Sequence, residues 1–269
     1  MKRSETKAGK ASPTLPLVSI VFVTYKRLER LRDTYWSLRE ICRYPNLEWI
    51  VCDDGSSAAI QTQIRKLAFD QYLLSERNQG MGANTNKGLL AANGDYVLHL
   101  QDDWTCSGPS DFIESGVELM GERPDVCMVQ FWRVADFPYP SIFHLSASRK
   151  RARIFLDFPG MVSEGKGFHI YSDRPHLKRR SVTATVGLYS ETIRPVAEVE
   201  EDYCNRFEQC ADQRVGIIEG YDKVFEHTGE QETFNPRQRR ENWRRFLRGH
   251  PVLRYPWNWY VRWRYGRSS

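Results

Sequence analysis

The stretch Tyr96-Val97-Leu98-His99-Leu100-Gln101-Asp102-Asp103-Trp104 decides the fold, because an apolar run leads directly into two adjacent carboxylates. Such a run predicts a buried strand of a parallel sheet, and open α/β sheets bind ligands at the carboxyl ends of their strands. Side chains alternate along a strand, so we expect the two acids to point in different directions. One would hold Mg²⁺ or Mn²⁺ and the other a ribose or a bridging water. The alternative is a polar loop whose Asp caps a helix.

The preceding segments alternate between strand patterns and helix patterns. Strand-like runs cover 17–23, 47–52 and 72–74, and helical spacing or capping residues mark 28–42, 58–69 and 83–92. This alternation predicts βαβ units and a parallel sheet. Right-handed crossovers place all the strand-end loops at one edge of the sheet, which we call the rim.

Three polar clusters are expected at that rim: Thr24 to Arg27, Asp53-Asp54 and Asp102-Asp103. An Asp at a strand end can accept the imide N–H of uracil or thymine, and Tyr25 can stack on a base. Arg27 and Lys87 can face a diphosphate. Taken singly, each feature also fits a simple turn or core packing.

Length and composition favour one large α/β domain with appendages. The chain has 269 residues, of which 41% are hydrophobic. It contains no apolar run of about 18 residues, and residues 1–16 lack an apolar signal-peptide core, so we expect a cytoplasmic protein with a disordered N-terminal tail. Its six cysteines lack the spacing of a zinc site, and we expect them to be reduced and mostly buried thiols.

The positive charge is concentrated in residues 235–269. This segment has ten Arg and one Glu, a charge of +9, which leaves −4 for the rest of a chain whose net charge is +5. Its arginines alternate with tryptophans and tyrosines. Three interpretations remain open: packing on the domain or in a homo-oligomer, peripheral contact with the inner face of an anionic membrane, and nucleic-acid binding, which we expect least.

Val18 to Trp104 resembles the nucleotide-binding half of the family 2 glycosyltransferases, which have the GT-A fold. The resemblance rests on an ordered series of motifs: the first strand with Thr24-Tyr25-Lys26-Arg27, then Glu48 to Ser56, Asn78-x-Gly80, Asn86-x-Gly88, and Gly94 to Val97 followed by the carboxylates. It implies a Rossmann-like, mostly parallel mixed sheet flanked by helices. The GT-A domain would span 17–234, with a nucleotide-binding half at 17–104 and an acceptor-binding half at 105–234.

The resemblance also implies roles for the rim residues. Tyr25 and Asp54 would contact the base, Asp102 would lie near the ribose and diphosphate, and Asp103 would be the principal metal carboxylate of an Asp-x-Asp motif. The first position of that motif is Gln101 in this chain, which leaves one metal carboxylate fewer. The nucleotide-sugar site as a whole is predicted to comprise Thr24, Tyr25, Arg27, Asp53, Asp54, Asn78, Gly80, Asn86, Lys87 and Asp102.

The second half is less regular. We expect helices at 111–122 and near 191–196 and strands at 126–134, 181–189 and 215–218. Residues 138–180 have no regular pattern. Their basic triplets, 149–151 and 178–180, are expected to be solvated loops or contacts to the acceptor. By the resemblance, Asp202 is the catalytic base of an acidic pair that opens a helix, with Glu201 in reserve and Arg206 paired to one of the acids. The alternative is that these acids complement a helix dipole. His227 is a candidate further metal ligand or an ordinary surface histidine.

Together these features predict an inverting transferase that moves a sugar from a UDP- or dTDP-linked donor to a hydroxyl of a glycan, lipid-linked or cell-envelope acceptor, with Mn²⁺ or Mg²⁺. Two alternatives remain. A sugar-phosphate nucleotidyltransferase would need a glycine-rich phosphate loop, and residues 24–27 contain no glycine. A non-catalytic nucleotide- or glycan-binding protein on the same fold is supported by Gln101 alone.

Overall fold

The computed structural model describes residues 15–131, 141–155, 169–193, 195–210 and 213–229. The chain divides into two units after Glu226, and the fold described below is that of the first unit. The N-terminal tail through residue 14 and the basic aromatic extension 235–269 lie outside the described residues. At the edge of the tail, the carbonyl of Pro16 accepts a hydrogen bond from the Tyr44 hydroxyl.

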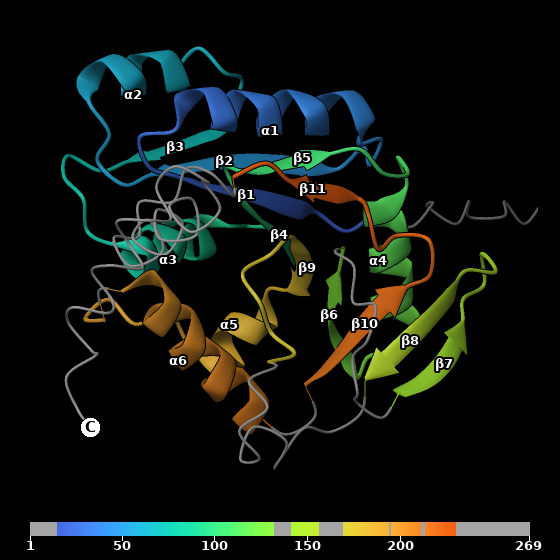
Figure 1. Ribbon diagram of the computed structural model, residues 1–269. Helices are drawn as coiled ribbons and strands as arrows, with labels where there is room; N and C mark the ends of the chain where they lie inside the picture. Colours follow the sequence, from blue (N-terminus) through green and yellow to red (C-terminus); the bar gives the residue numbers. More distant parts are fainter. Residues whose placement is uncertain (1–14, 132–140, 156–168, 194, 211–212, 230–269) are drawn as a thin grey trace, which may run out of the picture. The chain divides into compact units, whose positions relative to one another are not determined.

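The first half of the chain alternates strands and helices, as its sequence predicts (Figure 1). The elements are β1 (Val18–Thr24), α1 (Leu28–Ile41), β2 (Leu47–Asp53), α2 (Ala58–Ile64), β3 (Gln71–Leu74), α3 (Met81–Ala91) and β4 (Tyr96–Gln101). The second half contains β5 (Trp104–Cys106), α4 (Phe112–Glu122), β6 (Val126–Gln130), β7 (Ser141–Leu145), β8 (Arg151–Phe155), β9 (His176–Arg179), α5 (Ser181–Val186), α6 (Val196–Gln209), β10 (Arg214–Ile218) and β11 (Phe225–His227).

Nine of these strands form one mixed sheet in the order β3-β2-β1-β4-β9-β6-β10-β8-β7, and β11 pairs with β5 in a small second sheet. The strands from β3 to β4 are parallel, and so are β6 and β10. Strand β9 lies antiparallel between β4 and β6. The predicted mixed α/β sheet is therefore confirmed, and β9 joins its two parallel parts.

Alternation along the central strands divides the core into two layers. Val18, Ile20 and Phe22 belong to one apolar cluster with residues of α1 and α4, whereas Val21 and Val23 belong to another with residues of α3, α5 and α6. Figure 1 shows α1 and α2 on one side of the sheet and α3, α5 and α6 on the other. Because both faces are covered, the strands read as continuous apolar runs, and their carboxyl ends are left to form the rim.

Gly88 brings α3 close to the sheet. A Cβ at this position would lie 2.3 Å from Val21 Cγ1 and 2.7 Å from Cys52 Sγ, so no larger residue fits. The glycine of the Asn86-x-Gly88 motif therefore has a packing role. It sets the distance between α3 and the ends of β1 and β2.

Two predictions for residues 178–189 are wrong. Residues 181–189, expected as a strand, begin with helix α5, in which Val182 and Val186 are buried at helical spacing and Gly187, with φ 89°, follows the last turn. In the basic triplet 178–180, expected as a solvated loop, Lys178 and Arg179 end β9, Arg180 is the N-cap of α5, and Lys178 is fully buried. Local residue pattern fails here because the partners of both segments are distant in sequence.

The acidic run of the second half also lies elsewhere than predicted. The helix expected near 191–196 begins at Val196, after Pro195 at its N-cap, and continues to Gln209. Glu200, Glu201 and Asp202 therefore lie inside α6 rather than at its start, so a helix-dipole role does not apply to them. Strand β6 ends at Gln130, and the rest of the strand predicted to residue 134 includes residues that are not described.

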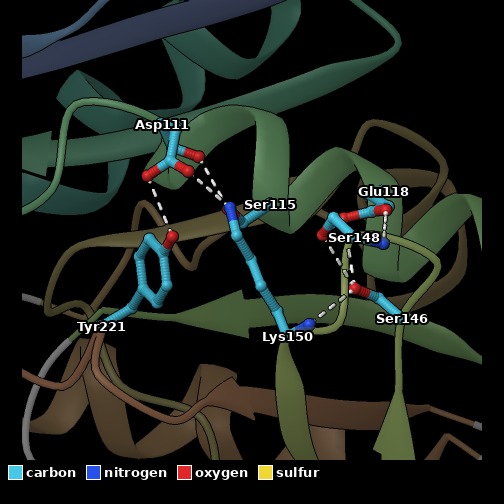
Figure 2. A network of polar contacts seen from close by, with 7 residues as sticks. All are labelled: Asp111, Ser115, Glu118, Ser146, Ser148, Lys150 and Tyr221. Atoms are coloured by element: carbon cyan, nitrogen blue, oxygen red, sulfur yellow. Dashed lines mark hydrogen bonds and ion pairs between the residues drawn. The ribbon is translucent and has the colours of Figure 1, made fainter.

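The other basic triplet, 149–151, belongs to a hairpin that is fixed to α4 (Figure 2). Lys150 Nζ lies 2.5 Å from Asp111 Oδ2 and 2.5 Å from Ser115 Oγ. Glu118 accepts hydrogen bonds from the backbone N–H and the hydroxyl of Ser148, at 2.9 and 2.5 Å. Lys150 thus ties the β7–β8 turn to the N-terminal end of α4.

The described residues include all six cysteines. None of them forms a disulfide, and Cys52, Cys106, Cys127 and Cys204 are buried. Burial raises the pKa of the Cys52 thiol to about 12, which keeps it protonated. In the described part of the chain, no helix combines the length and the apolar character needed to cross a membrane.

Candidate active site

The rim is formed where β1, β2 and β4 end side by side. Thr24 is in register with Asp53 at the ends of β1 and β2, and Val23 is in register with Gln101 of β4. The Thr24 hydroxyl then donates a 2.7 Å hydrogen bond to Asp102 Oδ2. The structure thus brings the three predicted polar clusters to one edge of the sheet.

Both carboxylates after β4 face the same arginine. The strand ends at Gln101, and a turn directs Asp102 Oδ1 and Asp103 Oδ2 to Arg27 Nη1, at 3.2 and 2.8 Å. The expectation that strand alternation would separate the two acids is therefore wrong, because neither lies in the strand. The pair forms a compact negative centre that already holds one cation.

Asp102 is held from several sides. Besides Thr24 and Arg27, the Thr34 hydroxyl of α1 donates a 2.9 Å hydrogen bond to its backbone carbonyl. Burial raises the pKa of Asp102 to about 6, although the Thr24 hydrogen bond and the Arg27 charge act in the opposite direction. Thr34 was not predicted as a site residue, since nothing in its sequence surroundings distinguishes it from any polar residue of α1.

The adjacent acids Asp53 and Asp54 organise the rim loops. Asp53 accepts hydrogen bonds from the backbone N–H and the hydroxyl of Ser56 and from the Gln61 amide. Asp54 accepts them from the Asn78 amide at 2.7 Å and from the backbone N–H groups of Gln79 and Gly80 at 2.7 and 3.0 Å. Asp54 therefore fixes the loop that leads into α3.

Gly80 ends the loop that Asp54 holds, and Tyr25 follows the end of β1. Gly80, with φ 101°, is the N-cap of α3, a conformation that favours glycine. Tyr25 is partly exposed at the rim, and the Lys26 ammonium lies 4.9 Å from its ring centroid. The predicted stacking of Tyr25 on a nucleobase stays a prediction.

Lys87 and Asn86 form hydrogen bonds that connect α3 to neighbouring segments. Lys87 Nζ donates to the carbonyls of Asp53 and Leu73 and to the Ser75 hydroxyl, so it joins the ends of β2 and β3. Burial lowers its pKa. The Asn86 side chain exchanges two hydrogen bonds with the backbone of Tyr189. These hydrogen bonds connect α3 to the ends of β2 and β3 and to Tyr189, and the predicted diphosphate and nucleotide contacts of Lys87 and Asn86 stay predictions.

The acids of α6 point in different directions. Asp202 Oδ2 accepts two hydrogen bonds from Arg206, at 3.1 and 2.8 Å, which is the Arg206 pairing that the sequence predicts. Glu201 is exposed. Glu200 instead accepts hydrogen bonds from the Asp173 N–H and the Ser172 hydroxyl, just before β9.

A buried ionisable cluster between β9 and α6 was missed by sequence reasoning. The Lys178 ammonium lies 5.3–5.9 Å from the ring centroids of Tyr171, Tyr189 and Tyr203, and burial lowers its pKa. The Tyr189 hydroxyl donates a 2.6 Å hydrogen bond to Asp173, whose pKa is raised by burial. No sequence signal links these residues, because they come from four separate segments.

A divalent metal fits the two carboxylates after β4. Both are buried, both reach a single cationic nitrogen, and carboxylate oxygen is the donor that Mg²⁺ and Mn²⁺ prefer. Within the described ranges, no three or more His, Cys, Asp or Glu side chains are arranged so that they could hold a metal ion together. His227 is exposed at the end of β11, and its predicted metal role stays a prediction.

Comparison with known proteins identifies a family model and relatives that match this chain. Residues 19–187 match the model of glycosyl transferase family 2. A putative glycosyltransferase EpsH of Bacillus subtilis is 29% identical over 120 residues, covering 43% of this chain and 34% of the relative. A GalNAc(5)-diNAcBac-PP-undecaprenol beta-1,3-glucosyltransferase of Campylobacter jejuni is 32% identical over 94 residues, covering 33% and 30%. The chain thus spans about a third of the length of these relatives.

Solved structures share the fold. S. aureus TarS 1–349 in complex with UDP has a TM-score of 0.55 at 16% identity, covering 78% of this chain and 59% of that one. The mannosyltransferase PcManGT of Pyrobaculum calidifontis, in complex with GDP-Man and Mn²⁺, has a TM-score of 0.51 at 16% identity, covering 76% and 55%. These likenesses confirm the GT-A fold, and the family match extends over more than half of the sequence. The chain belongs to glycosyl transferase family 2.

Proposed function

We propose that this chain is an inverting glycosyltransferase that moves a sugar from a nucleoside diphosphate to a hydroxyl group of a glycan or lipid-linked acceptor. The observation that carries the proposal is the rim of β1, β2 and β4. There, two buried carboxylates, Arg27 and the Asp54 loop meet at the sheet edge where α/β folds bind ligands. Membership of a glycosyltransferase family supports it.

For the donor, we propose a uracil or thymine nucleotide. An ionised carboxylate offers about four lone pairs, and three hydrogen bonds are made to Asp54, one of them to Oδ1. The imide N–H of uracil or thymine can use the remaining acceptor capacity while Tyr25 stacks on the ring. The structurally similar TarS binds UDP, whereas PcManGT binds GDP-Man, so the fold accommodates either class.

Asp103, with Asp102 beside it, would hold Mn²⁺ or Mg²⁺. When bound, the metal offsets the negative charge of the departing diphosphate. His227 is a proposed additional ligand. Thr24 and Thr34 keep Asp102 in place, and Asp54 keeps the 78–80 loop against the end of β2.

We propose Asp202 as the base that removes the proton of the acceptor hydroxyl as that oxygen attacks C1 of the sugar. Attack opposite the leaving diphosphate inverts the anomeric configuration. Arg206 orients the Asp202 carboxylate through its two hydrogen bonds. The acceptor is proposed to be a cell-envelope glycan, because the Campylobacter jejuni relative is named for an undecaprenol-linked substrate.

The test is the turnover of Asp202→Asn. We expect release of UDP, dTDP or GDP from matching sugar nucleotides to fall by about a hundredfold or more with Asp202→Asn, because a general base contributes 10²- to 10⁴-fold. The free energy of unfolding should change by about 0.5 kcal/mol, since Asp202 and Arg206 form a half-exposed pair one helical turn apart.

Glu201→Gln is the matched control. Glu201 is the neighbouring exposed carboxylate of α6, so its loss should leave turnover nearly unchanged. Equal losses in both variants would refute the assignment of Asp202. A folded wild-type protein that binds a nucleotide but releases none from any donor would favour a non-catalytic binding protein.

A further inference from the structure

The hairpin of β7 and β8 lies at one end of the nine-stranded sheet, where β7 is the edge strand (Figure 1). One face of the hairpin is in the core: Ala152 and Ile154 are 2% and 0% exposed and belong to the apolar cluster that includes residues of α4. Side chains alternate along a strand, so the residues between them point the other way. This opposite face, which we call the outer face, consists of the side chains of Phe143, Leu145, Arg151 and Arg153.

Large apolar side chains are exposed on the outer face. Phe143 and Leu145 are 57% and 63% exposed. In an antiparallel pair with one face on the core, the solvated face normally carries polar residues. An exposed Phe and Leu side by side on that face are therefore typical of a surface that contacts a partner. The Arg151 guanidinium lies 4.2 Å from the Phe143 ring centroid, which places a positive charge directly beside the apolar side chains.

The hairpin is also basic, in contrast to the body of the protein. Residues 141–155 contain three Arg, one Lys and no Asp or Glu, a charge of +4, whereas residues 1–234 as a whole carry −4. Arg151 and Arg153 are in register with the two exposed apolar residues and share their face. Arg149 is exposed in the turn. The hairpin thus combines apolar and cationic side chains on one surface.

Acidic residues near the hairpin leave a positive charge on this surface. Glu118 and Glu122 of α4 form hydrogen bonds with the turn and with His144, which alternates with the residues of the outer face. Glu219 is next to the outer face, and its Oε1 lies 3.5 Å from Arg151 Nε. The Arg151 side chain is nevertheless 55% exposed, so it can also contact an anion.

We propose that the outer face of the β7–β8 hairpin binds the surface of an anionic lipid bilayer. Phe143 and Leu145 enter the region between the headgroups and the acyl chains, and Arg149, Arg151 and Arg153 contact the anionic headgroups. Apolar side chains beside basic ones are the combination by which proteins bind such surfaces. The hydrogen bonds between the turn and α4 hold the hairpin in place for this contact (Figure 2). The proposal does not depend on the proposed glycosyl transfer.

A second copy of the chain is a less suitable partner for the outer face. A two-fold symmetric interface uses the same patch on both copies, so Arg151 and Arg153 would lie against the same arginines of the other copy. Like charges repel in such a contact, whereas anionic headgroups attract the arginines. The charge of the outer face therefore favours a bilayer over a homodimer.

Hydrogen–deuterium exchange of the full chain tests the location of the contact without any substitution. The protein is compared in buffer, with vesicles of phosphatidylcholine, and with vesicles of phosphatidylcholine and phosphatidylglycerol in equal parts. We expect the amides of residues 141–155 to exchange at least about threefold more slowly with the anionic vesicles, because the bilayer covers the edge strand. The phosphatidylcholine vesicles should leave this exchange unchanged.

Co-sedimentation with the same anionic vesicles tests the side chains. The double variant Phe143→Ser with Leu145→Ser and the double variant Arg151→Gln with Arg153→Gln should each bind about tenfold more weakly than the wild type. Circular dichroism verifies that the variants are folded. All proteins keep the basic extension, so its contribution to vesicle binding is the same in each.

Leu90→Ser and Lys66→Gln are the controls, because they remove an exposed apolar and an exposed basic residue elsewhere on the domain. Both should bind the vesicles as the wild type does. Lack of vesicle binding by the wild type, unchanged exchange of residues 141–155, or binding of the hairpin variants within about twofold of the wild type would each overturn the proposal. A lipid-free homodimer that dissociates in the Phe143→Ser and Leu145→Ser double variant, measured by sedimentation velocity, would also overturn it and assign the outer face to a second copy.

Discussion

At the scale of single residues, several of the predicted site residues hold neighbouring loops and strands in place. Asp53, Asp54, Asn86 and Lys87 hold loops and strand ends together through hydrogen bonds to backbone groups. The sequence motifs correctly placed these residues at the rim, but not their partners. Asn86 contacts the backbone of Tyr189, 103 positions away, and no local pattern encodes such a contact.

Replacement of Asp54 tests directly how much its hydrogen bonds stabilise the fold. In Asp54→Ala, two backbone N–H groups and the Asn78 amide lose a charged acceptor. We expect the free energy of unfolding to fall by about 3 kcal/mol, because hydrogen bonds to charged groups contribute roughly 1.5–3 kcal/mol each and do not add fully. Urea denaturation measures the loss. The control is Asp33→Ala, on the exposed face of α1, which should change the free energy of unfolding by less than about 0.5 kcal/mol. An equal effect in both variants would contradict the structural role of Asp54.

At the scale of elements, the first half of the chain could be predicted and much of the second half could not. Apolar runs bounded by turns identify β1, β2 and β4, because both faces of these strands are buried under helices. Strand β9 is just as buried but contains His176, Lys178 and Arg179. Its burial depends on Tyr171, Tyr189 and Tyr203, which surround Lys178, and this tertiary arrangement overrides the local preference.

The pairing of β4 with β9 predicts an acid-sensitive core. His99 and His176 stack with ring centroids 5.2 Å apart, and Lys178 of β9 also faces them. Burial lowers the pKa of His99 to about 3, against about 6.5 in the unfolded chain. The unfolded chain binds the proton of His99 more readily than the folded chain does. The free energy of unfolding is therefore unaffected by His99 above pH 6.5 and falls as the pH drops below that value.

His99→Phe tests this pH dependence, because it keeps a ring against His176 and removes the titrating group. We expect the free energy of unfolding, measured in urea, to fall between pH 7.5 and pH 5 in both proteins. The fall should be about 2 kcal/mol smaller in His99→Phe than in the wild type. Leu98→Val, a buried substitution on the same strand, should lower stability equally at both pH values. Identical pH profiles for His99→Phe and the wild type would show that His99 is not held neutral.

At the scale of the whole molecule, the distribution of charge favours a cation at the proposed donor site. Residues 1–234 carry a net charge of −4, and the rim itself contains four carboxylates, Asp53, Asp54, Asp102 and Asp103. A nucleoside diphosphate brings further negative charge to this edge. Arg27 carries a single positive charge next to these acids, so we expect a divalent metal to strengthen the binding of a diphosphate donor.

The most direct test of the central claim is a calorimetric titration of the wild-type protein with UDP, dTDP and GDP, each in Mn²⁺ and in EDTA. We expect one uracil- or thymine-containing diphosphate to bind in Mn²⁺ and to bind at least about tenfold more weakly in EDTA, because the metal links the diphosphate to Asp103. Asp103→Asn should remove this difference. No binding of any of the three by a folded protein, with or without metal, would contradict the account.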